Sequence, residues 1–205
     1  MSDLEIFNCE QGTPEWFEAR RGIPTASRFS DVLAKGQGIT RRKYLLTLAG
    51  EAITGDVAES YTNAHMERGH AMEADARNLY SLMKDVEPEL VGFMRRGRAG
   101  ASPDSLVGAD GMVEIKSKLP HILLDVLDKG KLPSEHVAQV QGQMMVSGRQ
   151  WCDFVAYWPK LPLFCIRVER DEKYIETLNQ AIADFVGELD EIIRRYGNPC
   201  GYQEA

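Results

Sequence analysis

The spacing of hydrophobic residues divides the chain of 205 residues into helical and strand-like stretches. From Ile175 to Tyr196, apolar residues recur every three or four positions, which predicts one long amphipathic helix over residues 171–196. A second long helix is predicted over residues 63–83. Short apolar runs bounded by turn residues predict strands. These strands cover residues 90–94, 104–107, 112–116, 151–158 and 163–170.

Local start and stop signals predict shorter helices. A threonine at the capping position marks three helix starts, at Thr13, Thr25 and Thr40. Glycines are predicted to end these three helices near Gly22, Gly36 and Gly55. Two more helices are predicted at residues 121–127 and 134–147. The sequence from Gly108 to Gly111 is typical of a hairpin turn between two of the predicted strands.

The order of these elements predicts a mixed α/β fold with a central mixed β-sheet flanked by α-helices. The composition is that of an ordinary globular protein, because 43% of the residues are hydrophobic and 27% are charged. No internal repeat and no linker rich in Pro, Gly or Ser divides the sequence. We therefore expect a single domain over residues 1–205.

Charge and cysteine usage restrict the class of protein further. The 24 Lys and Arg residues are outnumbered by 31 Asp and Glu residues, giving a net charge of −7. That balance argues against nucleic-acid binding over the whole surface, although it leaves room for a local basic groove. No apolar run reaches the roughly 18–20 residues that a membrane span needs. The first residues are acidic and lack the pattern of a secretory signal, so we expect none. Because no Cys-x-x-Cys pair occurs either, we expect free thiols and a cytoplasmic location in a bacterial or phage-infected cell.

The most informative stretch joins Ser102-Pro103-Asp104 to Glu114-Ile115-Lys116 across nine residues. Side chains alternate between the two faces of a strand, so Glu114 and Lys116 should point the same way. Asp104 lies across the predicted hairpin, but whether it stands opposite Glu114 depends on a register that the sequence leaves open. Two carboxylates that converge repel each other unless a hard cation lies between them. With a lysine beside them, they are suited to metal-assisted phosphodiester hydrolysis.

Two helix faces carry further polar residues. Glu73 interrupts a face of small or apolar residues, and a buried carboxylate there would need a cation or a hydrogen-bond donor. His136, Gln139 and Gln143 share one stripe of a later helix and could bind a ligand, a metal-bound water or DNA. The remaining residues of the Glu73 face are Met66, Gly69, Ala76, Tyr80 and Met83.

Each of these features also has a structural interpretation without function. Glu114 and Lys116 could form a solvated strand face, and Glu73 could pair with Arg77 one turn along its helix. The basic runs at residues 41–43 and 95–98 are more typical of solvated surface charge than of DNA contacts. Agreement among the acid pair, the third acid, the lysine and the glutamines favours the functional interpretation.

The motifs resemble those of the PD-(D/E)XK nucleases, and more specifically of the lambda exonuclease and YqaJ-type viral recombinase family. The blocks that carry the resemblance occur in the family's order along nearly the whole chain. They are Trp16 to Gly22 with Thr25 to Ser27, Gly69 to Arg77, Ser102 to Lys116, Ala138 to Gln141, and Glu169 to Tyr174. The resemblance implies a restriction-endonuclease-like core.

The same resemblance implies a 5′→3′ exonuclease that degrades one strand of double-stranded DNA from its ends to mononucleotides. It further implies two Mg²⁺ ions, with Mn²⁺ as a substitute, and a ring-shaped homotrimer. A single-strand annealing protein would be its partner in recombination, and no membrane would be involved.

Residue roles also follow from the resemblance. Asp104, Glu114 and the Ile115 carbonyl would bind one metal ion, and Glu73 would serve the second ion or its waters. Lys116 would position the attacking water with Gln139 beside it. Arg20, Ser27 and Ser102 match residues that hold the 5′-phosphate, and a guanidinium with two hydroxyls is suited to a terminal phosphate.

The sequence departs from the family at two positions: His136 replaces a tyrosine-like residue, and Arg68 replaces a tryptophan. Three other functions remain as alternatives. The chain could be an endonuclease of the same fold, a DNA-end-binding module without catalysis, or a structural metal protein. The last is disfavoured because the four cysteines and four histidines form no cluster.

Overall fold

The computed structural model describes residues 3–34, 39–56 and 64–197, with the side chains of 64–71 left out. Its strands form two sheets. The first is antiparallel, in the order β1-β2-β3, and the second has the order β4-β5-β6-β7, with β5 and β6 parallel. Their bounds are β1 (Leu4–Phe7), β2 (Phe93–Arg96), β3 (Ala99–Ala101), β4 (Ser105–Val107), β5 (Gly111–Ser117), β6 (Trp151–Tyr157) and β7 (Phe164–Glu169).

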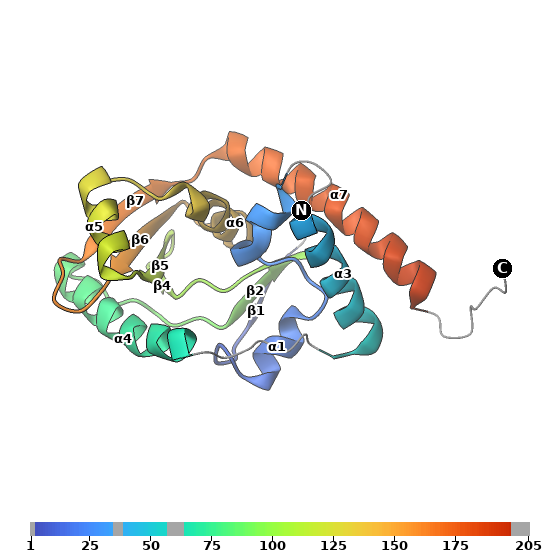
Figure 1. Cartoon of the computed structure of the whole chain (residues 1–205), viewed down its shortest axis with the longest axis horizontal. Helices are drawn as coiled ribbons and strands as arrows, with labels where there is room; N and C mark the ends of the chain where they lie inside the picture. Colours follow the sequence, from blue (N-terminus) through green and yellow to red (C-terminus); the bar gives the residue numbers. More distant parts are fainter. Residues whose placement is uncertain (1–2, 35–38, 57–63, 198–205) are drawn as a thin grey trace.

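Helices cover the sheets on both sides (Figure 1). Helix α4 runs along one side, while α5, α6 and α7 lie on the other. The helices are α1 (Pro14–Arg20), α2 (Phe29–Val32), α3 (Ile39–Thr54), α4 (Ala64–Lys84), α5 (Pro120–Lys129), α6 (Val137–Ser147) and α7 (Glu172–Tyr196), with short 3₁₀ turns at η1 (Ala26–Arg28) and η2 (Ser134–His136). Among the described residues, no helix has the length and apolar character needed to cross a lipid bilayer.

The four-stranded sheet buries different side chains on its two faces because neighbours along a strand alternate in direction. On one face, Val113 and Ile115 of β5 pack with Ala76 and Tyr80 of α4. On the other, Met112 of β5 joins the larger core that α6 and α7 complete. Glu114 and Lys116 belong by alternation to the second face, which places them under α6.

Several sequence predictions are confirmed. The Thr13 side chain accepts a hydrogen bond from the Trp16 backbone and caps α1. Asp171 caps α7 in the same way, so the periodic helix at the end of the chain begins as predicted. Strands β4 and β5 pair antiparallel on either side of the predicted hairpin turn. Cys9, Cys152 and Cys165 are free thiols.

Other predictions are wrong. The predicted mixed sheet is present as β4-β5-β6-β7, but a second, three-stranded sheet that contains β1 and β3 was not predicted. The strand predicted at 90–94 begins only at Phe93. Thr25 makes no capping hydrogen bond because its side chain contacts Arg20 and Ser27, and Thr40 lies inside α3 instead of before it. Gly36, the predicted end of the second helix, lies outside the described residues.

Helix α6 is buried around most of its circumference and is fixed by contacts at several points. A Cβ atom at Gly142 would come within 2.3 Å of the Phe29 ring, so α6 approaches α2 closely only because residue 142 is glycine. On another side, Gln141 donates to the Glu169 carbonyl and accepts from the Asp171 amide, both at 2.9 Å. Side chains on α6 are therefore held in fixed positions above β5.

The 3₁₀ turn before α6 ends in His136, which is largely buried. Its ring lies on Phe154 with the ring centroids 5.0 Å apart. Its Nε2 atom is 2.7 Å from the Lys118 ammonium, so the imidazole accepts this hydrogen bond in its neutral form. Burial, and then the positive charges of Lys118 and Lys116, lower the pKa of His136 to about 4.

This lowered pKa predicts that the protein loses stability on mild acidification. The unfolded chain binds the His136 proton near pH 6.5 and the folded chain near pH 4, so protons favour unfolding between these values. The free energy of unfolding should fall by up to about 3 kcal/mol as the pH drops through this interval. Urea denaturation from pH 7 to pH 4 measures the effect.

His136→Phe keeps the ring and removes the proton site, so it should flatten the pH dependence in this interval. His121→Phe changes an exposed histidine of α5 and is the matched control. An equal slope in the His136→Phe variant and the unaltered protein would contradict the assignment.

Candidate active site

The β4–β5 hairpin brings the two predicted carboxylates together. Ser105 pairs with Val113, and continuing this antiparallel register by one residue places Asp104 opposite Glu114. The backbone amide of Ile115 donates a hydrogen bond of 2.6 Å to Asp104 Oδ2, which fixes that carboxylate beside β5. The register that the sequence left open is therefore the one that brings the two acids together.

Glu114 is almost fully buried, and three side chains donate to its carboxylate. Gln143 Nε2 lies 2.6 Å from Oε2, and Gln139 Nε2 lies 2.5 Å from Oε1. The Lys116 ammonium also lies 2.6 Å from Oε1. Because β5 and α6 supply these donors, the charge of Glu114 is compensated inside the protein.

The carboxylates of the cluster outnumber its one ammonium group, and this imbalance shifts the pKa values of Asp104 and Lys116. Burial, and then the negative charges of Glu114 and Glu73, raise the pKa of Asp104 well above its usual value, against the opposing effect of Lys116. Burial alone would lower the pKa of Lys116, but Glu114 and Asp104 outweigh it and raise this pKa. The cluster therefore holds a stable ammonium and has an excess of carboxylate charge that an additional cation would relieve.

Glu73 lies close enough to act on Asp104, but its carboxylate forms an ion pair with Arg77 one turn along α4. The Glu73 side chain is 27% exposed to solvent, so the prediction of a buried acid is wrong. Arg77 also donates to Ser105 Oγ at 2.9 Å, which ties α4 to the hairpin. On the predicted face, Ala76 and Tyr80 are buried and Met83 is exposed, while Met66 and Gly69 lie in the part of α4 of which only the backbone is described.

The oxygen atoms of the cluster fit a divalent cation by their chemistry. Asp104 and Glu114 supply two neighbouring carboxylates, and hard cations such as Mg²⁺ prefer carboxylate and carbonyl oxygens. Glu73 could join them only by leaving Arg77. Within the described ranges, no three His, Cys, Asp or Glu side chains already stand grouped around one metal position.

The three residues assigned to the 5′-phosphate lie along one chain of contacts. Arg20 stacks on the Trp16 ring at 3.7 Å, and the Trp16 indole donates to Ser102 Oγ at 2.9 Å. On the other side, Arg20 reaches Thr25 Oγ1 at 3.4 Å, and Thr25 lies 3.4 Å from Ser27 Oγ. A guanidinium and three hydroxyl groups therefore gather at the start of the segment that leads to Asp104.

Thr25 and Trp16 were not predicted as members of this group of contacts. Thr25 is buried and forms an isolated bridge with Gly100 of β3, a contact between segments that are distant in sequence. The position of Thr25 in the sequence, between Arg20 and Ser27, could have indicated that it belongs with them. Burial lowers the pKa of Arg20, yet a guanidinium stays charged at neutral pH.

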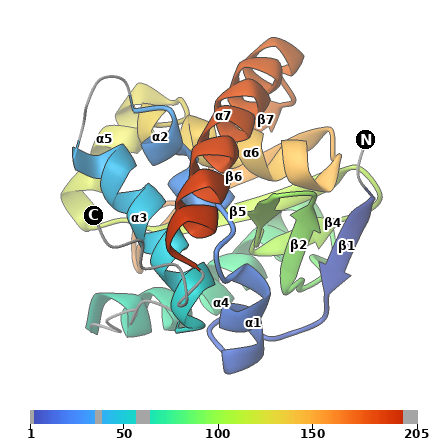
Figure 2. The same cartoon turned by 90° about the vertical axis from the view of Figure 1, so that its right-hand side faces the viewer.

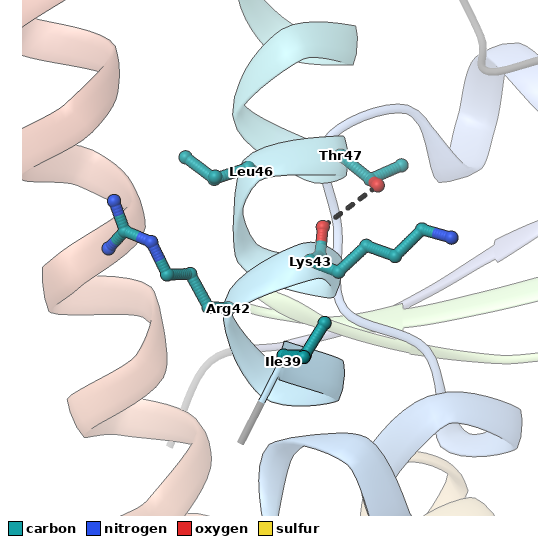
Figure 3. Close-up of a pocket in the computed structure, with 5 residues that line it drawn as sticks. All are labelled: Ile39, Arg42, Lys43, Leu46 and Thr47. Atoms are coloured by element: carbon teal, nitrogen blue, oxygen red, sulfur yellow. Dashed lines mark hydrogen bonds between the residues drawn. The ribbon is translucent and has the colours of Figure 1, made fainter. Parts of the chain in front are cut away.

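A basic groove lies away from this cluster, between α3 and α7, which run side by side (Figures 1 and 2). Two adjoining hollows of about 540 and 690 Å³ share Arg42 and Leu46. Figure 3 shows Arg42 reaching toward the neighbouring helix and Lys43 pointing the other way. The first hollow is lined by α3 alone, and the second lies between the two helices. Arg42, Arg194 and Arg195 outnumber Glu191 in the second hollow, so cations prevail in this groove.

Arg41, next to this groove, has a structural role. It forms a bidentate ion pair with Glu188 of α7 at 2.9 and 2.7 Å. The basic run at 95–98 is also largely engaged within the protein, because Arg95 pairs with Glu5, Arg96 donates to the Val146 carbonyl and Arg98 pairs with Asp190.

Known exonucleases have structures similar to that of this chain. LHK-Exo, an alkaline exonuclease from Laribacter hongkongensis, has a similar structure, with 37% sequence identity, a TM-score of 0.82, and coverage of 89% of this chain and 95% of that one. The structure of LHK-Exo in complex with dAMP matches with the same identity and coverage and a TM-score of 0.83. A phage-related exonuclease from Haemophilus somnus 129PT shares the fold at 13% identity and a TM-score of 0.65, over 84% of this chain and 95% of that one.

The protein ExoD of Escherichia coli (strain K12) is 29% identical over 75 residues, which cover 35% of this chain and 86% of that protein. The family described as the YqaJ-like viral recombinase domain matches residues 15–150. The α/β fold of this chain is thus the restriction-endonuclease-like fold of the alkaline exonucleases. The chain belongs to the YqaJ-like viral recombinase family.

Proposed function

We propose that the protein is a 5′→3′ exonuclease dependent on Mg²⁺ that degrades one strand of linear double-stranded DNA from its ends to 5′-phosphomononucleotides. Membership of the YqaJ-like family supports a nuclease role. The observation that carries the proposal is the hairpin that sets Asp104 opposite Glu114 with the Lys116 ammonium on the same carboxylate. This arrangement has the parts that metal-assisted phosphodiester hydrolysis needs.

In this proposal, Asp104, Glu114 and the Ile115 carbonyl hold one Mg²⁺ ion, and Glu73 serves a second. Mn²⁺ could substitute. When bound, such ions neutralise the charge that develops on the phosphoryl group and activate water. Lys116 donates hydrogen bonds that orient the attacking water, and its raised pKa keeps Nζ protonated at neutral pH. Gln139 donates to the same oxygen of Glu114 as Lys116 and helps to orient that carboxylate.

The phosphate pocket would give the enzyme its polarity. Arg20, Ser27 and Ser102 would bind the terminal 5′-phosphate of the cut strand, and Thr25 would bridge two of them. Ser102 and Asp104 are separated by one residue, so a strand whose end is held at Ser102 has its first phosphodiester near the carboxylates. A site built in this way acts on ends and excludes circular DNA.

The assembly belongs to the same proposal. Residues 1–205 would form a single nuclease domain, three copies of which make a ring around the duplex. A single-strand annealing protein would receive the exposed strand in homologous recombination of the phage type. The resemblance of the sequence motifs to the lambda exonuclease family supports these features.

Lys116→Ala should reduce the rate of hydrolysis at least about 100-fold, because the variant loses the group that orients water. Binding to duplex ends should remain, because the pocket around Arg20 is unchanged. Linear duplexes labelled at the 5′ or 3′ end, incubated with Mg²⁺ or with EDTA, measure rate and polarity. Lys129→Ala, at an exposed lysine of α5, is the control. Undiminished hydrolysis by Lys116→Ala, or loss of the 3′ label before the 5′ label in the unaltered enzyme, would refute the proposal.

Removal of the 5′-phosphate from a linear duplex should slow initiation about tenfold, the equivalent of one lost charge-assisted hydrogen bond. Arg20→Ala should erase this difference between phosphorylated and dephosphorylated ends. Arg21→Ala removes the neighbouring guanidinium, which is paired with Glu18, and should leave the difference intact. The measurement is the initiation rate on phosphorylated and on dephosphorylated ends. Equal rates in the unaltered enzyme would contradict the binding of the 5′-phosphate by Arg20.

The basic groove between α3 and α7 should contact the phosphate backbone of long DNA. Arg42→Glu should then shorten the tract degraded per binding event and weaken the salt dependence of binding. Lys129→Glu makes the same charge change on α5 and should have little effect on either quantity. If both variants leave tract length unchanged in a trap experiment, the groove has no part in DNA binding.

A further inference from the structure

We propose that Gln143 is a positioning residue that fixes Glu114, holding Oε2 permanently so that Oε1 alone is left to engage a divalent cation. This inference deepens the proposed function and rests on it. It assigns unequal roles to the two oxygens of one carboxylate, because their surroundings differ.

The contacts at the two oxygens are of different kinds. Oε2 accepts from Gln143, whose side chain is 1% exposed, as is that of Glu114. Oε1 accepts from Gln139 and Lys116, which are both partly exposed. A ligand entering from solvent can displace or share the donors at Oε1, whereas the donor at Oε2 lies within the packed core.

The Gln143 amide makes this contact at a cost. Its Oε1 atom is buried without a hydrogen-bond partner among the described residues. A buried acceptor without a partner destabilises the fold, and an apolar side chain of the same size would avoid that cost. Turning the amide over would not relieve the cost, because Oε1 would then face the Glu114 carboxylate. The orientation of Gln143 is therefore dictated by Glu114.

The backbone that carries Gln143 is also fixed. The Ser147 hydroxyl donates to the Gln143 carbonyl at 2.7 Å, and the preceding residue, Gly142, lies against Phe29. Gln141 anchors the opposite side of α6 to the start of α7. Because α6 cannot shift easily, Gln143 holds the plane of the Glu114 carboxylate when the donors at Oε1 rearrange.

The test replaces Gln143 by methionine, which fills a similar volume without a donor. Gln141→Met is the matched control, since it removes a buried glutamine with two hydrogen bonds from the same helix. Mn²⁺ binding by the full-length protein is measured by calorimetry without DNA, and the unfolding temperature is measured with and without Mn²⁺.

Gln143→Met should weaken Mn²⁺ binding about tenfold, the lower end of the effect expected from losing a partner of a metal ligand. It should shrink the Mn²⁺-induced rise in unfolding temperature, whereas Gln141→Met lowers stability but keeps the Mn²⁺ response. The Mg²⁺ concentration needed for half-maximal hydrolysis should rise by a similar factor. Equal Mn²⁺ affinity in Gln143→Met and the unaltered protein would overturn the inference.

Gln143→Asn provides a second variant if the methionine variant does not fold. It keeps the amide but withdraws it by one methylene, so Mn²⁺ affinity should fall here as well, and an unchanged affinity would again overturn the inference. The unaltered protein separates this inference from the proposed function. Absence of Mn²⁺ binding there would refute the metal-dependent mechanism itself, and with it any role of Gln143 toward a cation.

Discussion

The structure depends on the burial of one carboxylate. Glu114 lies on β5 beneath α6, where an ionised group is costly unless donors or cations surround it. Two glutamine amides and one ammonium supply part of what it needs, and Asp104 beside it adds a second negative charge. The resulting excess of carboxylate oxygen is difficult to explain as a means of stabilising the fold, and the proposed binding of a hard cation rests on it.

The scaffold connects this cluster to the candidate phosphate pocket through a short stretch of chain. Ser102 follows β3, and Asp104 precedes β4, so the two sheets meet between the pocket and the acids. The turn that contains Thr25 bridges to β3 and brings Ser27 to the same place. A small displacement of β3 relative to β4 would therefore alter both the recognition of an end and the position of the bond to be cut.

Much of the arrangement was predictable from local sequence patterns. The period of two along β5 placed Glu114 and Lys116 on one side, and the 3.6-residue period defined α7. The family motifs identified the remaining candidates. Strands β1 and β3 were missed because they are short, and β3 is Ala-Gly-Ala, which has no β-branched residue to signal a strand.

The partners of individual side chains were harder to predict, since they depend on how distant segments pack. Glu73 could turn to Arg77 or to the acids, and the sequence left both open; it pairs with Arg77. Thr25 was predicted to cap a helix, but its hydroxyl contacts Arg20 and its backbone forms a bridge with Gly100 of β3. Gln143 was predicted to share one helix face with Gln139, but its hydrogen bond to Glu114 could not be predicted because it depends on α6 packing above β5.

The most direct test of the central claim is a crystal structure of the protein soaked with Mn²⁺, with anomalous diffraction recorded to locate the ion. We expect an anomalous peak between the Asp104 and Glu114 carboxylates, on the side of Glu114 Oε1. Mn²⁺ bound only elsewhere, with the Asp104 and Glu114 carboxylates left without a metal ion, would contradict it.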